Sequence, residues 1–261
     1  MEDTARRHDS LVLAGSLDED PERERELVRL MVDRRVDALV IAPASAEQGY
    51  LARELPATTP VVFVDRPPRG FAADAVVTDN GAASEAAVTH LAAAGHHRIG
   101  FFGDLGSIPT AAQRRAGYRR GLAAAGLAAD PHLEAADLRN AADVGRAITA
   151  ALDLADPPTA LFTARNEITV VAIGVLRERG LSDRVALIGF DDFPLADLVT
   201  PGITVIAQSP YEIGRLAGEI AFARLTGDDG PARTHVVASR LIPRGSGEIR
   251  APSRWRRRGG P

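Results

Sequence analysis

Short apolar runs alternate with stretches of helical periodicity along almost the whole chain, and this alternation limits the fold more than any other feature. Val185–Ile188 is one such run. It leads into Gly189 and fits a strand that is buried on both faces of a parallel sheet. The helical stretches place apolar residues three and four positions apart, as at Ile168, Val171, Ala172, Val175 and Leu176. Strands that alternate with helices predict an α/β fold with mainly parallel sheets.

The chain has more predicted strands than one open sheet usually holds, so we expect two α/β lobes, each with its own sheet. They span residues 11–14, 38–42, 60–64, 75–78, 98–102, 159–163, 185–188, 203–206 and 236–241. Asp20 is positioned to cap a helix that has Pro21 in its first turn. Other helices are predicted to end at or near Gly95, Gly126, Gly180 and Gly227. Residues 104–110 are the best candidate for the first crossing between the lobes.

Composition narrows the class of protein. The net charge of −4 gives no reason to expect nucleic acid at the surface, apart from a short cationic end at Arg254–Arg258. The chain has no cysteine, which excludes disulfides, thiolate chemistry and cysteine-bound metals. The first ten residues are polar and carry no signal peptide, and no run approaches the roughly 18 apolar residues of a membrane span. We therefore expect a soluble, cytoplasmic protein with no membrane partner.

Polar side chains follow several of the predicted strands. Asp191 and Asp192 come directly after the run at 185–190, Asp65 follows the strand at 60–64, and Asn166 opens the helix after the strand at 159–163. Acid, amide and guanidinium groups that converge on a cleft suit a ligand with several hydroxyl groups. Plain structural roles are equally open at this point: a helix cap for Asn166, and solvated surface charge for Asp65 and for Arg114.

Catalysis and metal binding are weaker alternatives. The paired acids Asp191 and Asp192 could chelate Mg²⁺, but the chain lacks a phosphate-cradling loop. It also lacks a nucleophile elbow and an H-E-x-x-H motif. The adjacent His96 and His97 point apart in a loop or strand, so one cation is a poor fit for both. We expect no enzyme activity, no cofactor and no metal site.

Eight motifs occur in a fixed order along the chain: DRRVDALVI at 33–41, PVVFVDR at 60–66, VVTDN at 76–80, HLAAAGHHRIG at 90–100, RRAGY at 114–118, PTALF at 158–162, IGFDD at 188–192 and PGITV at 201–205. Together they resemble the lactose-repressor (LacI/GalR) family of bacterial transcription regulators. The resemblance implies two doubly wound lobes with parallel sheets, like type I periplasmic binding proteins. It places one lobe at residues 1–104 plus 203–229 and the other at 105–202 plus 230–252. From its composition, the basic end at 253–261 is expected to be a disordered tail.

The resemblance also implies where an effector binds. Matched motif by motif, the effector contacts are Asp65, Thr78, Asp79, Arg114, Asn166 and Asp191. Phe193 is the aromatic side chain that the sequence places best for stacking on a sugar. Asp192 is expected to hold the following loop by accepting a backbone N–H. The implied partners are a small-molecule effector, by default a sugar, and a second copy of the chain.

Operator DNA would be contacted only through a helix-turn-helix segment, which these residues lack, as they lack the family's first core strand. The resemblance therefore implies an N-terminally truncated core. Because that strand lies centrally in a doubly wound sheet, its neighbours would keep unpaired backbone groups, and we expect the chain to be poorly stable by itself. An exported sugar-binding protein of a transport system would share this fold and is the alternative function. The absence of a signal peptide argues against it.

Overall fold

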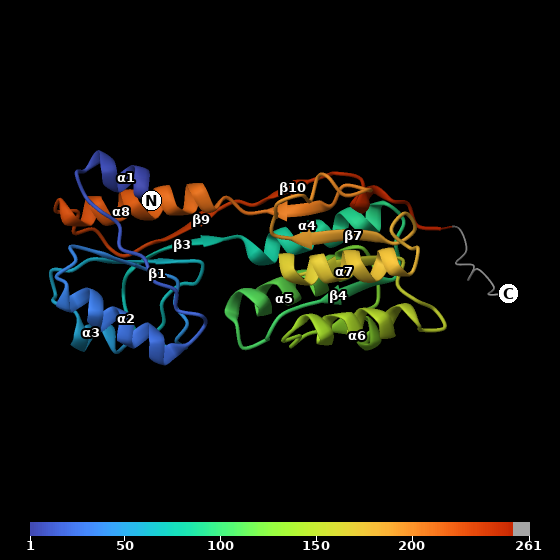
Figure 1. Ribbon diagram of the computed structural model, residues 1–261, viewed down its shortest axis with the longest axis horizontal. Coiled ribbons are helices and arrows are strands. Elements are labelled where there is room, and N and C mark those ends of the chain that lie inside the picture. The colour runs from blue at the N-terminus through green and yellow to red at the C-terminus, as the bar shows by residue number, and fades with distance from the viewer. Residues whose placement is uncertain (253–261) are drawn as a thin grey trace. The chain divides into compact units, whose positions relative to one another are not determined.

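The computed structural model describes residues 1–252 and divides into two α/β units (Figure 1). The first unit comprises Met1–Thr78 and Ser209–Ala238, and the second comprises residues 79–208 and the chain from Ser239 onward. The α/β class with parallel sheets is confirmed. Residues 253–261, which carry the predicted basic tail, lie outside the described residues.

The first unit holds one parallel sheet in the order β1-β2-β3-β9. Its strands are β1 (Leu39–Ile41), β2 (Val61–Val64), β3 (Asp74–Thr78) and β9 (Thr234–Val237). Its helices are α1 (Glu2–Arg7), α2 (Pro21–Asp33), α3 (Leu51–Glu54) and α8 (Pro210–Leu225). Apolar side chains alternate between the two faces: Phe63 packs in the core with α2 and α3, whereas Val62 packs against α8. Asp20 caps α2 through the N–H groups of Glu22 and Arg23, as predicted.

The second unit holds a larger sheet in the order β10-β8-β7-β6-β4-β5, parallel except for β10. Its strands are β4 (Ile99–Phe102), β5 (Glu134–Ala135), β6 (Ala160–Thr163), β7 (Ala186–Phe190), β8 (Thr204–Ala207) and β10 (Arg240–Ile242). Its helices are α4 (Asn80–Ala93), α5 (Pro109–Ala124), α6 (Ala141–Leu152) and α7 (Asn166–Glu178), with short 3-10 turns η1 (Pro131–Leu133) and η2 (Ser246–Glu248). One core lies between the sheet and α4 and α5, and a second lies beneath α6 and α7.

The observed division of the chain differs from the predicted one. The first crossing falls between Thr78 and Asp79 rather than at 104–110, because β4 pairs with β6 and therefore belongs to the second sheet. Likewise β8 pairs with β7 in the second unit, and β9 pairs with β3 in the first. The predicted strand at 236–241 is in fact two strands, β9 and β10, which lie in different sheets.

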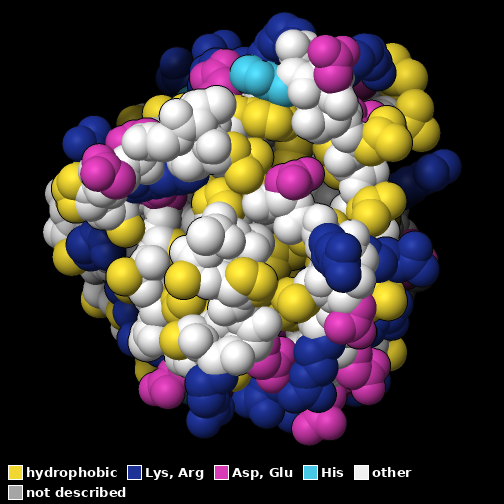
Figure 2. All heavy atoms as spheres, turned by 90° about the vertical axis from the view of Figure 1, so that its left-hand side faces the viewer, with side chains coloured by type: hydrophobic (Ala, Val, Ile, Leu, Met, Phe, Trp, Pro, Cys, Tyr) yellow, Lys and Arg dark blue, Asp and Glu magenta, His cyan; other side chains and the backbone are white. Residues whose placement is uncertain are grey.

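The predicted strand at 11–14 does not form. Leu11 is 96% exposed and Leu13 is 57% exposed, and this segment pairs with no other strand of the described chain. β1 pairs directly with β2 and forms the edge of its sheet, so the unpaired backbone groups expected beside a missing central strand do not occur inside this sheet. Figure 2 shows the face of the first unit that lies on the left of Figure 1, where hydrophobic side chains spread across the middle and charged ones crowd the lower rim. Within residues 1–252, every helix is too short or too polar to cross a bilayer.

Candidate functional site

Polar residues follow four neighbouring strands of the second sheet. Asp104 follows β4, Arg165 follows β6, Asp191 follows β7 and Gln208 follows β8. Because these strands run parallel, their carboxyl ends meet at one edge of the sheet, where open α/β sheets bind their ligands. The sequence predicted this placement for Asp191 and for Arg165, and the structure adds Asp104 and Gln208.

Arg114 is the most constrained of the predicted site residues. It lies on α5, its side chain is 9% exposed, and its guanidinium stacks on the Phe190 ring at 3.8 Å. Nε donates to Asn80 Oδ1 (2.8 Å), and Nη1 donates to the Ala164 carbonyl (2.8 Å) and lies 3.5 Å from Asp191 Oδ2. These contacts fix the charged group in one orientation, so Arg114 is not a solvated surface residue.

Asp191 presents the accessible acid of this arrangement, because its side chain is 25% exposed. Its backbone has a positive φ of 72°, a conformation that Asp tolerates better than most residues, and its N–H donates to the Ile206 carbonyl (2.9 Å). Gln208 Nε2 donates to its carboxylate. We call Asn80, Arg114, Asp191 and Gln208 the Arg114 cluster. It joins a fixed cation to a carboxylate that solvent can reach.

A second group of charges lies at the same edge of the sheet. Arg165 donates to Asp104 and pairs with Glu167 Oε2 (2.6 Å). Asn166 begins α7, and its amide oxygen accepts the N–H of Glu167 (2.8 Å). The N-cap position of α7 is Arg165 rather than Asn166, and no side chain caps this helix end, so the capping alternative for Asn166 is wrong; its contact with an effector stays a prediction.

The remaining predicted residues are distributed over both units. Asp65 directly follows β2 in the first unit and has a φ of 67°, and its Oδ2 lies 3.2 Å from Arg66 Nε. Thr78 ends β3 and is buried. Asp79 Oδ1 accepts the N–H of Ser239 (2.9 Å), which ties together two points where the chain passes from one unit to the other. Of the seven predicted residues, the structure joins Arg114 and Asp191 directly.

Phe193, the predicted stacking platform for a sugar, is half-buried in the loop after β7, and its stacking role stays a prediction. Its side chain packs against the core beneath α6 and α7, whereas Phe190, on the opposite face of the sheet, lies under the guanidinium. The change of side follows from the alternation of side chains along β7 and from the turn that begins at Asp191.

Asp192 has the structural role that the sequence predicted. It accepts the N–H of Phe193 (3.0 Å) and also receives both terminal nitrogens of Arg244 (2.6 and 2.7 Å). The Arg244 guanidinium lowers the pKa of this carboxyl below its ordinary value. The adjacent acids thus separate into a loop anchor and a member of the Arg114 cluster.

Sequence reasoning missed Asn80 and Gln208. Both had a usable signal, because each is a polar side chain one or two positions beyond a predicted strand. The described residues contain no group of three or more His, Asp or Glu side chains that could hold a metal ion. His96 is buried, with Nδ1 2.8 Å from Thr159 Oγ1 and Nε2 2.7 Å from the Ile249 carbonyl. The His96 ring therefore joins the Thr159 side chain to the Ile249 backbone, which is a structural role.

Known proteins resemble the chain over most of its length. Residues 88–247 match the family described as periplasmic binding protein-like domain. The HTH-type transcriptional regulator PtxS of Pseudomonas aeruginosa is 32% identical over 250 residues, which are 94% of this chain and 72% of PtxS. A candidate ribose operon repressor from Burkholderia thailandensis is 33% identical, with a TM-score of 0.82 over 92% of this chain and 90% of that one. The complex of the transcriptional regulator CelR with cellobiose is 26% identical, with a TM-score of 0.75 over 86% of this chain and 70% of that one.

Proposed function

The chain belongs to the lactose-repressor (LacI/GalR) family and is the effector-binding core of a transcriptional regulator, and on this premise we propose that its effector is a sugar or a similar hydroxyl-rich molecule held by the Arg114 cluster. The geometry of Arg114 and Asp191 carries the proposal. A hydroxyl group can donate to the exposed Asp191 carboxylate and accept from the fixed guanidinium, so neighbouring hydroxyls on one ring satisfy both. Asn166 would add an amide that both donates and accepts.

The relatives support a sugar as the class of effector. One is named for a ribose operon, and another is described in complex with cellobiose. Asp65 and Thr78 of the first unit, with Asp79, remain predicted contacts of the same effector. The relatives are transcriptional regulators rather than enzymes or transport proteins. We accordingly propose a binding function without catalysis.

A thermal-shift screen of pentoses, hexoses and disaccharides, followed by calorimetric titration of each hit, tests the proposal. Asp191→Asn keeps the shape of the side chain but removes the charge, and Arg114→Met removes the guanidinium. Hydrogen bonds to charged groups contribute about 1.5–3 kcal/mol, so each variant should weaken binding about 10- to 100-fold. Asp197→Asn, an exposed acid in the loop after β7, is the matched control and should bind like the unmodified chain. Unchanged affinity in both site variants would refute the site.

We further propose that the regulator is a homodimer and that the second unit contributes to the contact. This unit exposes large apolar side chains on α7 and on the loop after β7, namely Val170, Leu195 and Leu198. Changing Leu195 and Leu198 to Glu should shift the sedimentation profile from dimer to monomer. A dimer that survives both changes would exclude this surface.

We propose that operator DNA is bound through a helix-turn-helix segment, which these 261 residues do not contain. We also propose that the protein is cytoplasmic. Effector binding would favour one conformation of the core and so change the spacing of paired DNA-binding segments on a palindromic site. The HTH-type names of the relatives support this assignment. A gel shift with the 261-residue chain should show no sequence-specific complex, and a specific complex would contradict the assignment.

A further inference from the structure

The outer edge of β9 carries backbone groups that the sheet leaves unused. β9 is the last strand of the first-unit sheet, and within residues 1–252 it pairs only with β3. Ala75 N–H donates to the Arg233 carbonyl (2.9 Å), and Ala75 lies opposite Thr234 in a parallel register. Because the direction of backbone groups alternates along a strand, the N–H and C=O groups of Thr234 and Val236 point away from β3. They can pair with another strand.

One face of this edge is exposed and apolar. Val236 is 62% exposed, and Thr234 is also exposed on the same face. Natural edge strands usually avoid pairing by carrying Pro or Lys, or by being covered. The four residues of β9 include neither Pro nor Lys. An exposed valine on an open edge is therefore a place where a second strand gains apolar contact.

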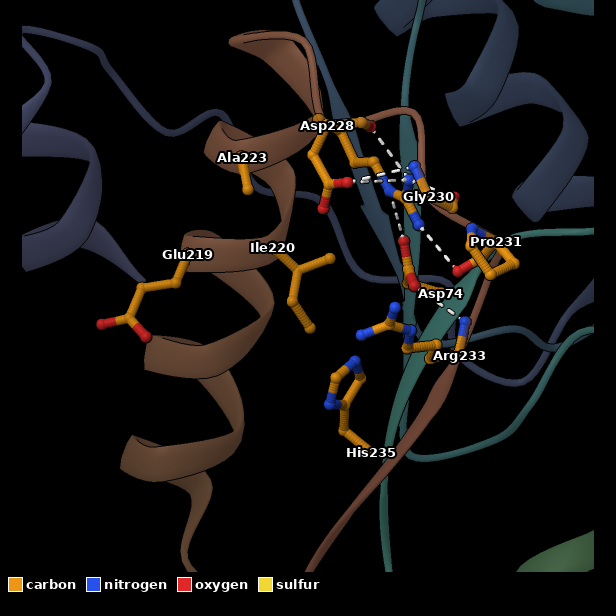
Figure 3. Close-up of a pocket in the computed structure, with 10 residues that line it drawn as sticks. Asp74, Glu219, Ile220, Ala223, Asp228, Gly230, Pro231, Arg233 and His235 are labelled. Carbon is orange, nitrogen blue, oxygen red and sulfur yellow. Dashed lines mark hydrogen bonds and ion pairs between the residues drawn. The ribbon is translucent and has the colours of Figure 1, made fainter.

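The other face of β9 borders a cavity of about 210 Å³ between β9 and α8 (Figure 3). Arg233, directly before β9, and His235 of β9 point into it, and neither side chain makes a hydrogen bond or ion pair with a described residue. The acids that line the cavity are already engaged: Asp74 accepts from Arg224 Nε (2.7 Å), Glu219 pairs with Arg215, and Asp228 lies 3.8 Å from Arg224. Arg233 is thus the positively charged side chain left open to a ligand, and His235 beside it offers ring nitrogens for hydrogen bonds.

We infer that the outer edge of β9 is a docking site for an extended segment of a partner protein in which acidic residues alternate with β-branched ones. An added strand lies about 4.8 Å from β9 and bonds to the backbone of Thr234 and Val236. Its acidic side chains fall beside Arg233 and His235 on the cavity face. Its β-branched side chains fall beside Val236 on the exposed face.

Charge favours a partner over a second copy of the chain. If β9 paired with β9 of another copy about a two-fold axis perpendicular to the sheet, the two faces would be preserved. Arg233 of both copies would then lie on one face, and like charges close to each other destabilise a strand pair. An acidic strand instead supplies the opposite charge to Arg233 and a hydrogen-bond acceptor to His235.

The test uses the whole chain and a fluorescein-labelled, capped peptide of alternating valine and glutamate, followed by anisotropy. Binding should saturate and weaken with added salt, and a valine–lysine peptide should not bind. Val236→Pro removes an N–H that points away from β3 and should weaken peptide binding at least about tenfold. The hydrogen bonds between β9 and β3 stay intact, because they use the N–H groups of His235 and Val237. Val236→Thr keeps the N–H and should bind within about threefold of the unmodified chain.

Arg233→Glu should weaken binding of the glutamate peptide about tenfold and improve binding of the lysine peptide. This charge exchange keeps the test decisive if Val236→Pro fails to fold. Failure of the glutamate peptide to saturate at millimolar concentration, or equal binding of both peptides, would overturn the inference. Self-association of the chain that Val236→Pro abolishes, without peptide binding, would assign the edge to a second copy instead.

Discussion

Gly117→Ala should destabilise the second unit, although Gly to Ala in a helix normally has the opposite effect. Gly117 lies within α5, where α5 crosses α4. A Cβ atom at this position would lie 2.2 Å from the Gly81 carbonyl oxygen and 2.8 Å from Ser84 Cβ. Ordinary contact begins at 3.4 Å, so the two helices would have to separate by more than 1 Å. A rigid backbone carbonyl cannot move aside as a flexible side chain could.

The magnitude follows from three opposing contributions. Helix propensity favours alanine by up to about 1 kcal/mol. Overpacking costs about 1–3 kcal/mol. Separating the helices also moves Asn80, which precedes Gly81 on α4, away from Arg114 Nε, and a hydrogen bond to a charged group contributes about 1.5–3 kcal/mol. The net loss should be about 2–4 kcal/mol, or a fall in Tm of about 5–15 °C.

Thermal denaturation followed by far-ultraviolet circular dichroism measures this loss. Gly174→Ala is the matched control: Gly174 lies within α7 of the same unit, and an added Cβ would meet no atom within 4 Å. That change should raise stability by about 0.5–1 kcal/mol. In the nuclear magnetic resonance spectrum, the protected Nε–H of Arg114 should be lost in Gly117→Ala only. A Gly117→Ala chain as stable as the unmodified one would refute the packing argument.

Three further predictions concern stability. Glu24→Ala should lower the free energy of unfolding, measured by urea denaturation, by about 3–5 kcal/mol. The buried Glu24 carboxylate accepts hydrogen bonds from the N–H groups of Ala44 and Ser45 and from the Tyr50 hydroxyl. A loss under about 1 kcal/mol would show that these three donors find other partners. Burial lowers the pKa of His96 in the folded chain, so the unfolded chain binds a proton there more readily. The contribution of His96 to the free energy of unfolding is therefore complete above about pH 6.5, the ordinary histidine pKa. It is lost as the pH falls from there through the lower pKa of the folded state. His96→Gln should flatten the stability profile between pH 7.5 and 5, and an unchanged slope would assign it to other groups. The whole chain should denature at low urea with weak cooperativity, since β1 is an open edge and Leu11 is exposed; a sharp transition from monodisperse protein would contradict this.

The sequence alone determined the features that depend on neighbours along the chain. The apolar run before Asp191 is β7, and Asp20 caps α2. The glycines at 95, 126, 180 and 227 all have positive φ and end helices, because only a residue without Cβ adopts that conformation freely. Asp192 holds the loop that follows it. Each of these interactions spans a few residues, so a local pattern is enough to predict it.

Only the tertiary structure decided which strands share a sheet. A strand pattern shows that a segment can pair but not with which partner, so the crossing at Thr78–Asp79 and the separate places of β9 and β10 were not predictable from periodicity. Residues 11–14 have a strand pattern and still form no strand, with Leu11 and Leu13 exposed, although β1 leaves an edge open; the local pattern does not decide whether a segment pairs.

The same distinction applies to the site. The sequence predicted Arg114 and Asp191 as effector contacts, but their bonds to Asn80 and Gln208 join residues far apart in the chain. Likewise, the stacking of Phe190 under the Arg114 guanidinium was not predictable, because the face on which a side chain emerges depends on how β7 sits in its sheet. Composition and periodicity set the secondary structure, whereas strand pairing and helix packing determined which polar groups meet, since those contacts depend on burial shared across the whole unit.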